Sequence, residues 1–306
     1  MIKSIGAAQH HPTNRTLEDF RRYWAENHGP LYSHVRPLTR RYVQHITLPE
    51  AYGIDPAPTF DGVSMFWSDD LPSQRPRSTD PQAMEANRAV PADDAQLFDR
   101  IPSWPTQHKR ASVAAEERVI LEGETSPEMV KAIFIVARLP GLNLNEFFEH
   151  WQFYNGALTA EIPGLRRYVQ NHAVAEAYAG GGQTHDGWSE LWFDDLASLH
   201  RAAQSPEWKA AQHDGVDLFS DNVGVGVARE RIQKDFDWTN TDWGVGEMDE
   251  NAIRQRLKDN NYTALAEDPD APAKIKTAAS NAALGIWTDQ HLVTIDASRI
   301  DARPDR

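Results

Sequence analysis

The pattern of apolar and polar positions is written twice along the chain. Residues 2–11 alternate or run apolar, as β-strands do, and residues 130–138 repeat the pattern. Each stretch is followed by large apolar residues at helical spacing, which predicts a helix with one apolar stripe. These residues are Leu17, Phe20 and Trp24 in the first copy and Leu144, Phe147, Phe148 and Trp151 in the second.

The two copies share sequence as well as pattern. Arg-Arg-Tyr-Val-Gln stands at residues 40–44 and again at 166–170. Two longer pairs also align: LEDFRRYWAENHGPL (17–31) with LNEFFEHWQFYNGAL (144–158), and FDGVSMFWSDD (60–70) with HDGWSELWFDD (185–195). The spacing between equivalent positions changes little, so the chain contains an internal repeat.

Each copy predicts the element order β-α-β-β-α-β. The repeated strand is followed by a strand that starts at Asp-Gly, a second helix, and a final strand at 111–120 or 223–232. This is the ferredoxin-like unit, whose antiparallel sheet has helices on one face only. The bare face must be buried. The sequence therefore predicts an α+β fold in which two units, 1–122 and 129–232, close a barrel within one chain.

Residues 233–306 lie outside the repeat. They contain Trp238, Trp243 and Trp287, which is unusual for a solvated tail. Short helices are predicted at 251–260 and 272–285. We expect this C-terminal extension to be an arm that packs over the barrel or clasps a second subunit, as in a homodimer, and that can close a pocket.

Composition narrows the classes of function. The 306 residues are 40% hydrophobic, enough for a buried core, and the net charge of −14 disfavours nucleic acid and anionic membranes as partners. The absence of cysteine excludes disulfides, thiolate catalysis, iron–sulfur clusters and cysteine-ligated zinc. No apolar run is long enough for a signal peptide or a membrane span, so a cytoplasmic protein is expected.

Several motifs resemble those of the EthD family of dimeric α+β barrel proteins, over about residues 1–232. The second unit carries PGLRRYVQNH (163–172), DGWSELWF (186–193) and SPEW (205–208), and the first carries FRRYWAENHGP (20–30) and RRYVQ (40–44). The resemblance implies small enzymes that act on aromatic, lactone or polyketide-like compounds, often as cyclases, isomerases, dehydratases, decarboxylases or cofactor-independent oxygenases. More distant branches bind haem. It also implies a pocket within each unit, but one fold hosts many chemistries.

Differences between the copies indicate specialisation. One face of the first strand holds Ser4, Gly6, Ala8 and His10 in unit one, against Ala132, Phe134, Val136 and Arg138 in unit two. Smaller side chains in unit one predict a cavity, unless bulky neighbours such as the nearby tryptophans fill the space.

Histidines near the helix end and the repeated strand are candidates for proton transfer. His28 ends the first helix, where it could equally cap carbonyls. His172 shares a strand face with Tyr168, whereas His45 comes one residue early. Either a bulge restores the facing of His45, or its side chain points to the opposite side of the sheet.

Glu190 stands where unit one has Met65, on the same strand face as Trp188 and Trp192. A carboxyl group between indoles is expected to have a raised pKa and to serve as a general acid or base. The alternative is an ion pair with Arg166 or Arg167.

The candidate catalytic residues are His28, His45, Tyr42, Asp61, His172 and Glu190. The candidate substrate-binding residues are His10, His11, Trp24, Arg40, Arg41, Trp67, Arg166, Tyr168 and Trp188. An arginine can hold a carboxylate by a bidentate bond, but salt bridges to the many acidic residues are the alternative. The tyrosines can equally be core aromatics, and the Asp-Gly pair that contains Asp61 is typical of a turn or a strand start. No dedicated metal site is expected, because the histidines lack ligand spacing.

Together these observations predict a cofactor-independent lyase, of decarboxylase or dehydratase type. It would act by general acid–base chemistry on an aromatic or apolar organic acid in a catabolic or secondary-metabolic pathway. The alternatives are an isomerase or cyclase on similar compounds, a cofactor-free or haem-dependent oxidative enzyme with His28 or His172 as axial ligand, and a non-catalytic small-molecule binding barrel.

Overall fold

The computed structural model describes most of both units and part of the extension. The described residues are 2–11, 15–34, 39–68, 81–99, 112–178, 185–221, 223–235, 250–259, 267 and 269.

The two units repeat one order of elements. Unit one contains β1 (Ile2–His10), α1 (Leu17–Tyr23), the π-helical η1 (Trp24–His28), α2 (Gly29–His34), β2 (Thr39–Thr47), the 3-10 helix η2 (Pro49–Ala51), β3 (Gly62–Ser68), α3 (Pro81–Leu97), β4 (Phe98–Asp99) and β5 (Ser112–Leu121). Unit two contains β6 (Val130–Val136), α4 (Leu144–His150), the π-helical η3 (Trp151–Asn155), α5 (Gly156–Ala160), β7 (Leu165–Ala173), α6 (Ala175–Tyr178), β8 (Gly187–Phe193), α7 (Leu196–Ala203), α8 (Pro206–Gly215) and β9 (Gly224–Asp235).

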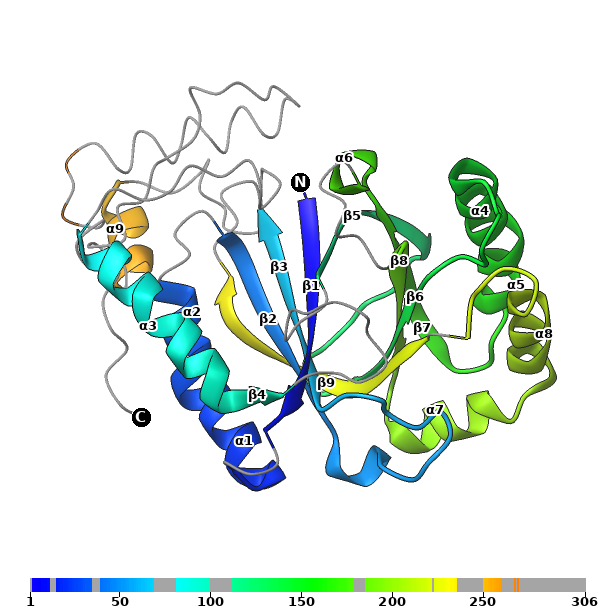
Figure 1. Ribbon diagram of the computed structural model, residues 1–306, viewed down its shortest axis with the longest axis horizontal. Helices are drawn as coiled ribbons and strands as arrows, with labels where there is room; N and C mark the ends of the chain where they lie inside the picture. The colour runs from blue at the N-terminus through cyan, green and yellow to red at the C-terminus, as the bar shows by residue number, and fades with distance from the viewer. Residues whose placement is uncertain are drawn as a thin grey trace.

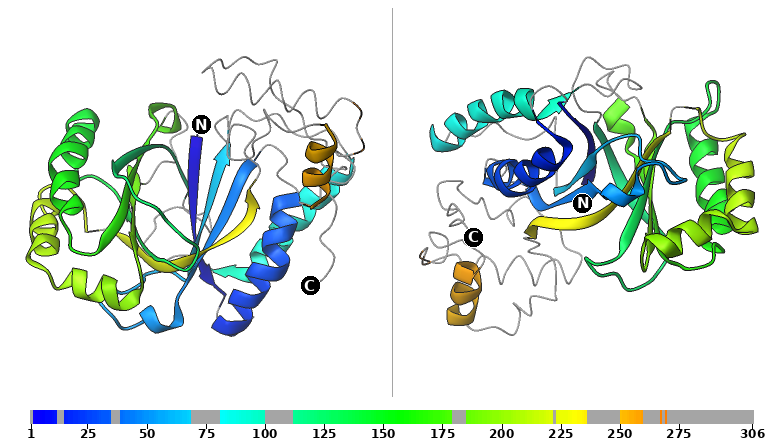
Figure 2. Two further views of the ribbon diagram at one scale, coloured as in Figure 1. Left: turned by 180° about the vertical axis from the view of Figure 1, so that it is seen from behind. Right: turned by 90° about the horizontal axis from the view of Figure 1, so that it is seen from below.

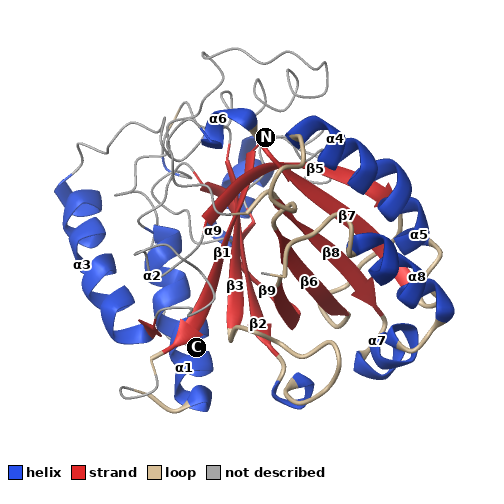
Figure 3. Ribbon diagram, turned by 45° about the vertical axis from the view of Figure 1, so that its right-hand side comes forward, coloured by secondary structure: helices blue, strands red, loops and turns tan. Residues whose placement is uncertain are grey.

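The strands close into a barrel. Their order is β3-β2-β9-β6-β8-β7-β5-β1-β4, and β1 also pairs with β3, so the sheet returns to its start. The units join through the antiparallel pairs β2–β9 and β5–β7. Helices of unit one line one flank and helices of unit two the opposite flank, as Figure 1 shows, and the views from behind and below agree (Figure 2). The predicted intrachain α+β barrel is confirmed (Figure 3).

Closure divides the core into layers. One buried cluster has members from both units, among them Ile5, Met65, Ile133 and Trp188, and it occupies the barrel interior. Other clusters lie between the sheet and the helices, and in unit one Phe20 and Trp24 pack there beside Ala8. Strands such as β6, β7 and β8 are therefore buried on both faces along much of their length.

The first helix of each unit begins and ends in the same way. Thr16 caps α1 by accepting a hydrogen bond from the backbone N–H of Asp19, and Asn143 caps α4. Each helix then passes into a π-helical turn that starts at a buried tryptophan, Trp24 or Trp151. A π-helical turn inside an α-helix frequently marks a functional position.

The extension is described only in part. Its α9 (Glu250–Asp259) coincides closely with the helix predicted at 251–260, and Arg254 donates to the carbonyl of Pro269. The helix predicted at 272–285 lies outside the described residues. Most of the arm expected at 233–306 does so as well.

The glycine of each Asp-Gly motif allows the tryptophan to approach the sheet. A Cβ on Gly62 would lie 2.1 Å from the Trp24 indole, and one on Gly187 would lie 2.1 Å from the Asn171 carbonyl oxygen and 2.9 Å from Trp151. We expect Gly62→Ala and Gly187→Ala each to lower the free energy of unfolding by about 1–3 kcal/mol through overpacking. Urea unfolding measures this, with the exposed Ala157→Ser as control. Unchanged midpoints for both alanine variants would contradict the close approach.

Candidate functional site

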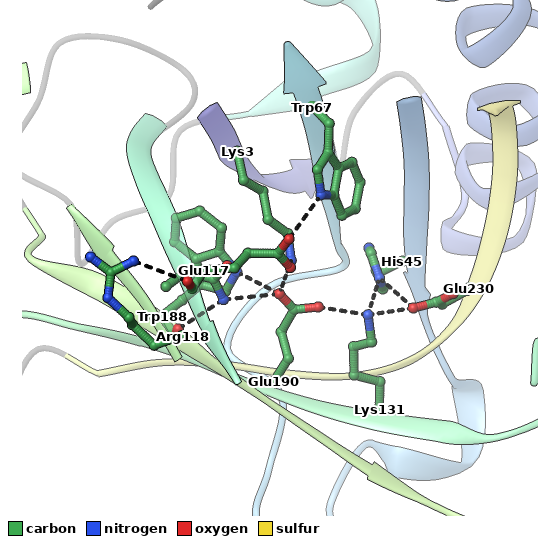
Figure 4. A network of polar contacts seen from close by, with 10 residues as sticks. Lys3, His45, Trp67, Glu117, Arg118, Lys131, Trp188, Glu190 and Glu230 are labelled. Carbon is green, nitrogen blue, oxygen red and sulfur yellow. Dashed lines mark hydrogen bonds and ion pairs between the residues drawn. The ribbon is translucent and has the colours of Figure 1, made fainter. Parts of the chain in front are cut away.

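A network of charged side chains crosses the barrel interior and joins the two units (Figure 4). Its members are Lys3 on β1, Glu117 on β5, Lys131 on β6, Glu190 on β8, Glu230 on β9 and His45 on β2. Glu190 contacts both ammonium groups, with Lys131 Nζ at 2.7 Å from its Oε2 and Lys3 Nζ against its Oε1. Lys3 Nζ also lies 2.8 Å from Glu117 Oε1, and Lys131 contacts Glu230.

The network is nearly symmetric between the units. Lys3 on β1 pairs across the sheet with Ala115, two residues before Glu117. Lys131 on β6 pairs in the same way with Ala228, two residues before Glu230. The symmetry breaks at two places. Unit two has Glu190 where unit one has Met65, and unit one has His45 where unit two has Asn171.

The copies of the repeated strand therefore diverge at a position that faces the barrel interior, directly after Arg-Arg-Tyr-Val-Gln. Tyr42 and Gln44 face the helices, whereas His45 points to the opposite side, where its Nε2 accepts a hydrogen bond from Lys131 Nζ at 2.9 Å. Of the two arrangements left open for His45, the opposite facing is the one observed. Asn171 faces inward in the same way and donates to Glu190 Oε1 at 3.0 Å.

The electrostatics correct the expectation for Glu190. Burial opposes ionisation, but the charges on Lys131 and Lys3 outweigh it and hold the pKa of Glu190 below its usual range. The expected raised pKa is therefore wrong, and the partners are lysines rather than Arg166 or Arg167. Burial, with the charge on Lys131, lowers the pKa of His45 to about 4. At neutral pH the network holds ion pairs and a neutral imidazole.

The tyrosine and glutamine of the repeated segment fasten the helix to the sheet. Gln44 Nε2 donates to the Trp24 carbonyl at 2.9 Å and to the Tyr42 hydroxyl at 2.9 Å. In unit two, Gln170 Nε2 makes the same two bonds to Trp151 and Tyr168, at 2.8 and 2.7 Å. The duplicated RRYVQ thus secures the π-helical turn in each unit. Tyr42 and Tyr168 have core roles there.

His28 has a similar structural role. Its Nδ1 lies 2.6 Å from Asp93 Oδ2, and its Nε2 lies 3.7 Å from Asp94 Oδ1, so the end of η1 is tied to α3. At the equivalent position Asn155 ties η3 to α8 by donating to Asp214 Oδ2 and to the Ala211 carbonyl, both at 3.0 Å.

His172 lies on the helix side of β7 and packs against two aromatic rings. Its ring centroid is 4.5 Å from that of Phe148 and 4.8 Å from that of Trp151, and both pairs are stacked. Its Nε2 contacts Gln170 Oε1 at 3.0 Å. Burial, with the charge on Arg118, lowers the pKa of His172 to about 3. The ring is a neutral packing element at neutral pH.

Asp61 lies at the centre of a polar cluster at the end of β1. It accepts hydrogen bonds from the Tyr52 hydroxyl at 2.5 Å and from the backbone N–H of His10 at 2.9 Å, and its Oδ2 lies 2.7 Å from His10 Nδ1. Burial and the Asp61 carboxylate raise the pKa of Tyr52, which keeps its hydroxyl protonated.

Unit two has the same cluster with an arginine, Arg138, at the position of His10. Asp186 accepts from the Tyr178 hydroxyl at 2.6 Å and from the backbone N–H of Arg138 at 2.7 Å, and it pairs with the Arg138 guanidinium. Unit one therefore has a histidine where unit two has an arginine. The sequence analysis missed both tyrosines, although their spacing equals that of the RRYVQ copies.

The remaining candidates are spread over the fold. The indole of Trp67 donates to Glu117, and that of Trp188 donates to Glu190. The guanidinium carbon of Arg41 lies 5.0 Å from the centre of the Trp67 ring, and Arg40 is a half-buried residue of β2.

The other three candidates have separate surroundings. Arg166 pairs with Asp194 on the surface. His11 donates its backbone N–H to the Leu97 carbonyl, and Trp24 is buried against Phe20. Arg41 and Arg166, proposed as carboxylate-binding residues, therefore lie in different surroundings.

Haem does not fit His28 as an axial ligand. An axial histidine needs a free ring nitrogen that faces an open position. Both nitrogens of His28 face carboxylates. The His172 ring is stacked on Phe148 and Trp151, and its Nε2 is engaged by Gln170.

In the described part of the chain, no group of three or more His, Asp or Glu residues has the arrangement of a metal site. No helix within the same residues has the length and apolar character needed to cross a membrane.

The geometry is that of two ferredoxin-like units closed into one α+β barrel, with different polar clusters in the two halves. The family model described as "EthD domain" matches residues 13–100 and 139–222, more than half of the chain. The chain belongs to the EthD family, and the resemblance inferred from its motifs is confirmed.

Solved structures were also compared. An EthD family protein from Bacillus halodurans is 27% identical, covers 34% of this chain and 99% of its own, and has a TM-score of 0.29. A dimeric protein of ferredoxin-like fold from Bacteroides fragilis is 19% identical, with coverages of 33% and 96% and a TM-score of 0.28. An anthrone oxidase-like protein is 10% identical, with coverages of 76% and 93% and a TM-score of 0.47. A search of curated proteins gave no match.

Removal of the carboxylate that bridges the units should weaken the whole barrel. Glu190→Gln leaves Lys3 and Lys131 each with one carboxylate fewer in a buried setting, and we expect a loss of about 3 kcal/mol in the free energy of unfolding. Urea denaturation measures this loss. Glu116→Gln, which removes an exposed carboxylate that pairs with Arg118, is the control and should change stability little. Equal stability of the two variants would contradict the bridging role.

The buried histidine stack should make stability depend on pH. The pKa of His172 is about 3 when folded and about 6.5 when unfolded, so between these values the unfolded chain binds more protons. Stability should therefore fall as the pH drops below about 6.5, by up to about 1.4 kcal/mol per pH unit for this group.

His172→Ile, which installs the residue that unit one has at this position (Ile46), should reduce that slope between about pH 6.5 and 5. Unfolding curves across this range test the expectation. An unaltered slope would show that His172 is not buried in its neutral form.

Proposed function

We propose that the chain is an enzyme that acts without a cofactor on an aromatic or otherwise apolar organic acid, and that unit one carries the reaction. The reaction class is a lyase step, decarboxylation or dehydration, in which His10 transfers a proton and Asp61 orients it. Isomerisation or cyclisation would use the same groups. A homodimer that forms through residues 233–306 remains part of the proposal.

The observation that carries the proposal is the contact between His10 and Asp61. The 2.7 Å contact fixes the His10 ring through Nδ1 and leaves Nε2 without a hydrogen-bond partner among the described residues. The side chain of His10 is 23% exposed, which is consistent with access to the ring. A base oriented by a carboxylate, with its second nitrogen open, is the arrangement that general acid–base catalysis requires.

Each candidate step needs only these groups. In a decarboxylation, the carboxylate leaves as carbon dioxide, its electron pair stays on the adjacent carbon, and that carbon takes the proton from His10 Nε2. In a dehydration, His10 Nε2 removes a proton from carbon, the electron pair forms a double bond, and the hydroxyl leaves as water with the proton that His10 returns to it.

The aromatic surface beside β1 supports an apolar substrate. On the helix side of this sheet, the Tyr42 ring stacks on the Phe66 ring with a centroid distance of 4.5 Å, and the Tyr32 ring centroid lies 5.2 Å from that of Phe66. Tyr32 and Phe66 are only partly buried. Unit two fills the position of Gly6 with Phe134, which packs against Trp208 at 6.0 Å. Unit one thus leaves aromatic faces on which a flat ring could stack.

The test exchanges the residues that distinguish the two units. His10→Arg copies the Arg138–Asp186 arrangement, so the fold should persist while proton transfer is lost. With a panel of aromatic carboxylic acids and mass spectrometry for loss of carbon dioxide or water, we expect kcat to fall by about 100-fold or more. Arg138→His should keep wild-type turnover. Full activity in His10→Arg would refute the proposal, as would products that gain oxygen with oxygen uptake.

A further inference from the structure

The guanidinium of Arg21, on α1, lies beside the Tyr52 ring, and two of its nitrogens make no hydrogen bond among the described residues. Its Nε and Nη2 are shielded from solvent, and neither makes a hydrogen bond in the described part of the chain. These two nitrogens form one edge of the guanidinium, the edge that matches the two oxygens of a carboxylate. A buried N–H without an acceptor is costly. The edge is therefore prepared for an acceptor that the described side chains do not supply.

The position of Arg21 connects this edge with the His10–Asp61 cluster. The guanidinium carbon lies 5.6 Å from the centre of the Tyr52 ring, and the Tyr52 hydroxyl donates to Asp61. Tyr52 is 37% exposed, and the His10 side chain also keeps an exposed fraction. The Arg21 guanidinium thus lies, shielded from solvent, beside a cluster whose Tyr52 and His10 reach the surface.

Unit two shows that the cation is not needed for folding. Phe148 stands at the position of Arg21 and stacks on His172. The only arginine of that cluster among the described residues, Arg138, comes from the strand and is paired with Asp186. In unit one the arginine of the cluster is on the helix, and His10 occupies the strand position. The Nε and Nη2 of Arg21 make no hydrogen bond with Asp61.

We infer that Arg21 binds the carboxylate of an organic acid through Nε and Nη2, beside Tyr52 and His10. The inference rests on the proposed function, since it names the group that the acid of the substrate would meet. Two parallel charge-assisted bonds fix both the position and the plane of the carboxylate. A neutral amide of the same shape cannot replace it, because it offers one acceptor and a competing donor.

Binding can be measured without knowledge of the true substrate. We would titrate acetate, benzoate and 1-naphthoate, each against its primary amide, into the full-length chain by calorimetry. The wild type should bind at least one acid more tightly than the corresponding amide. Arg21→Gln should lower the affinity for that acid by about tenfold or more and leave the affinity for the amide unchanged. Arg21→Lys, which keeps the charge but not the paired donors, should recover only part of the affinity.

Arg22→Gln is the matched control. Arg22 is the next residue on α1, carries the same charge, and is an exposed partner of Asp19. It should bind the acids like the wild type. Circular dichroism of each variant checks that the fold is retained.

Two results would overturn the inference: no acid that binds more tightly than its amide, or equal losses in Arg21→Gln and Arg22→Gln. The proposed function can fail separately. If the acids bind through Arg21 but His10→Arg leaves turnover intact, the binding site stands and the catalytic assignment falls. If turnover requires His10 but acid binding is unchanged in Arg21→Gln, the catalytic assignment stands and the binding site falls.

Discussion

The bridge from Glu190 to Lys3 and Lys131 is the interaction on which the barrel depends. Two sheets that pack face to face usually bury apolar side chains, and isolated charges there would be very costly. Here one carboxylate accepts from an ammonium group of each unit, and Glu117 and Glu230 complete the pairing. The charges are tolerable only when both units are in register, so the network specifies how the halves meet.

The barrel interior is occupied by ion pairs, and the proposed site lies instead in the outer layer between the sheet and the helices. Both units keep the same fastening there, through the tyrosine and glutamine of RRYVQ and the π-helical turn. Against this shared frame, the replacement of arginine by histidine beside Asp61 stands out. Unit two has an arginine ion pair at this place, and unit one has a histidine whose Nδ1 contacts Asp61 and whose Nε2 makes no hydrogen bond among the described residues.

The repeat carried enough information to derive the fold, because strand alternation, helix stripes and matching motifs agree in both copies. The inward face of Trp188, Glu190 and Trp192 also follows from alternation alone. The charge state of Glu190 does not follow from alternation, because alternation does not show which side chains meet across the barrel interior, and the two lysines come from strands of different units. Arg21 and Tyr52 escaped notice for another reason. Arg21 has the spacing of an ordinary polar helix position, and Tyr52 lies in a turn without periodicity.

The closed barrel also has a consequence for how such a protein can change. In a symmetric pair of identical chains, every substitution appears twice about the dyad, so a glutamate at the position of Glu190 would bring a second glutamate into the same interior. Fusion makes the two halves separate stretches of one gene and keeps them at fixed stoichiometry and high effective concentration. One half can then acquire a single bridging carboxylate while the other acquires a histidine, and neither change requires its mirror image.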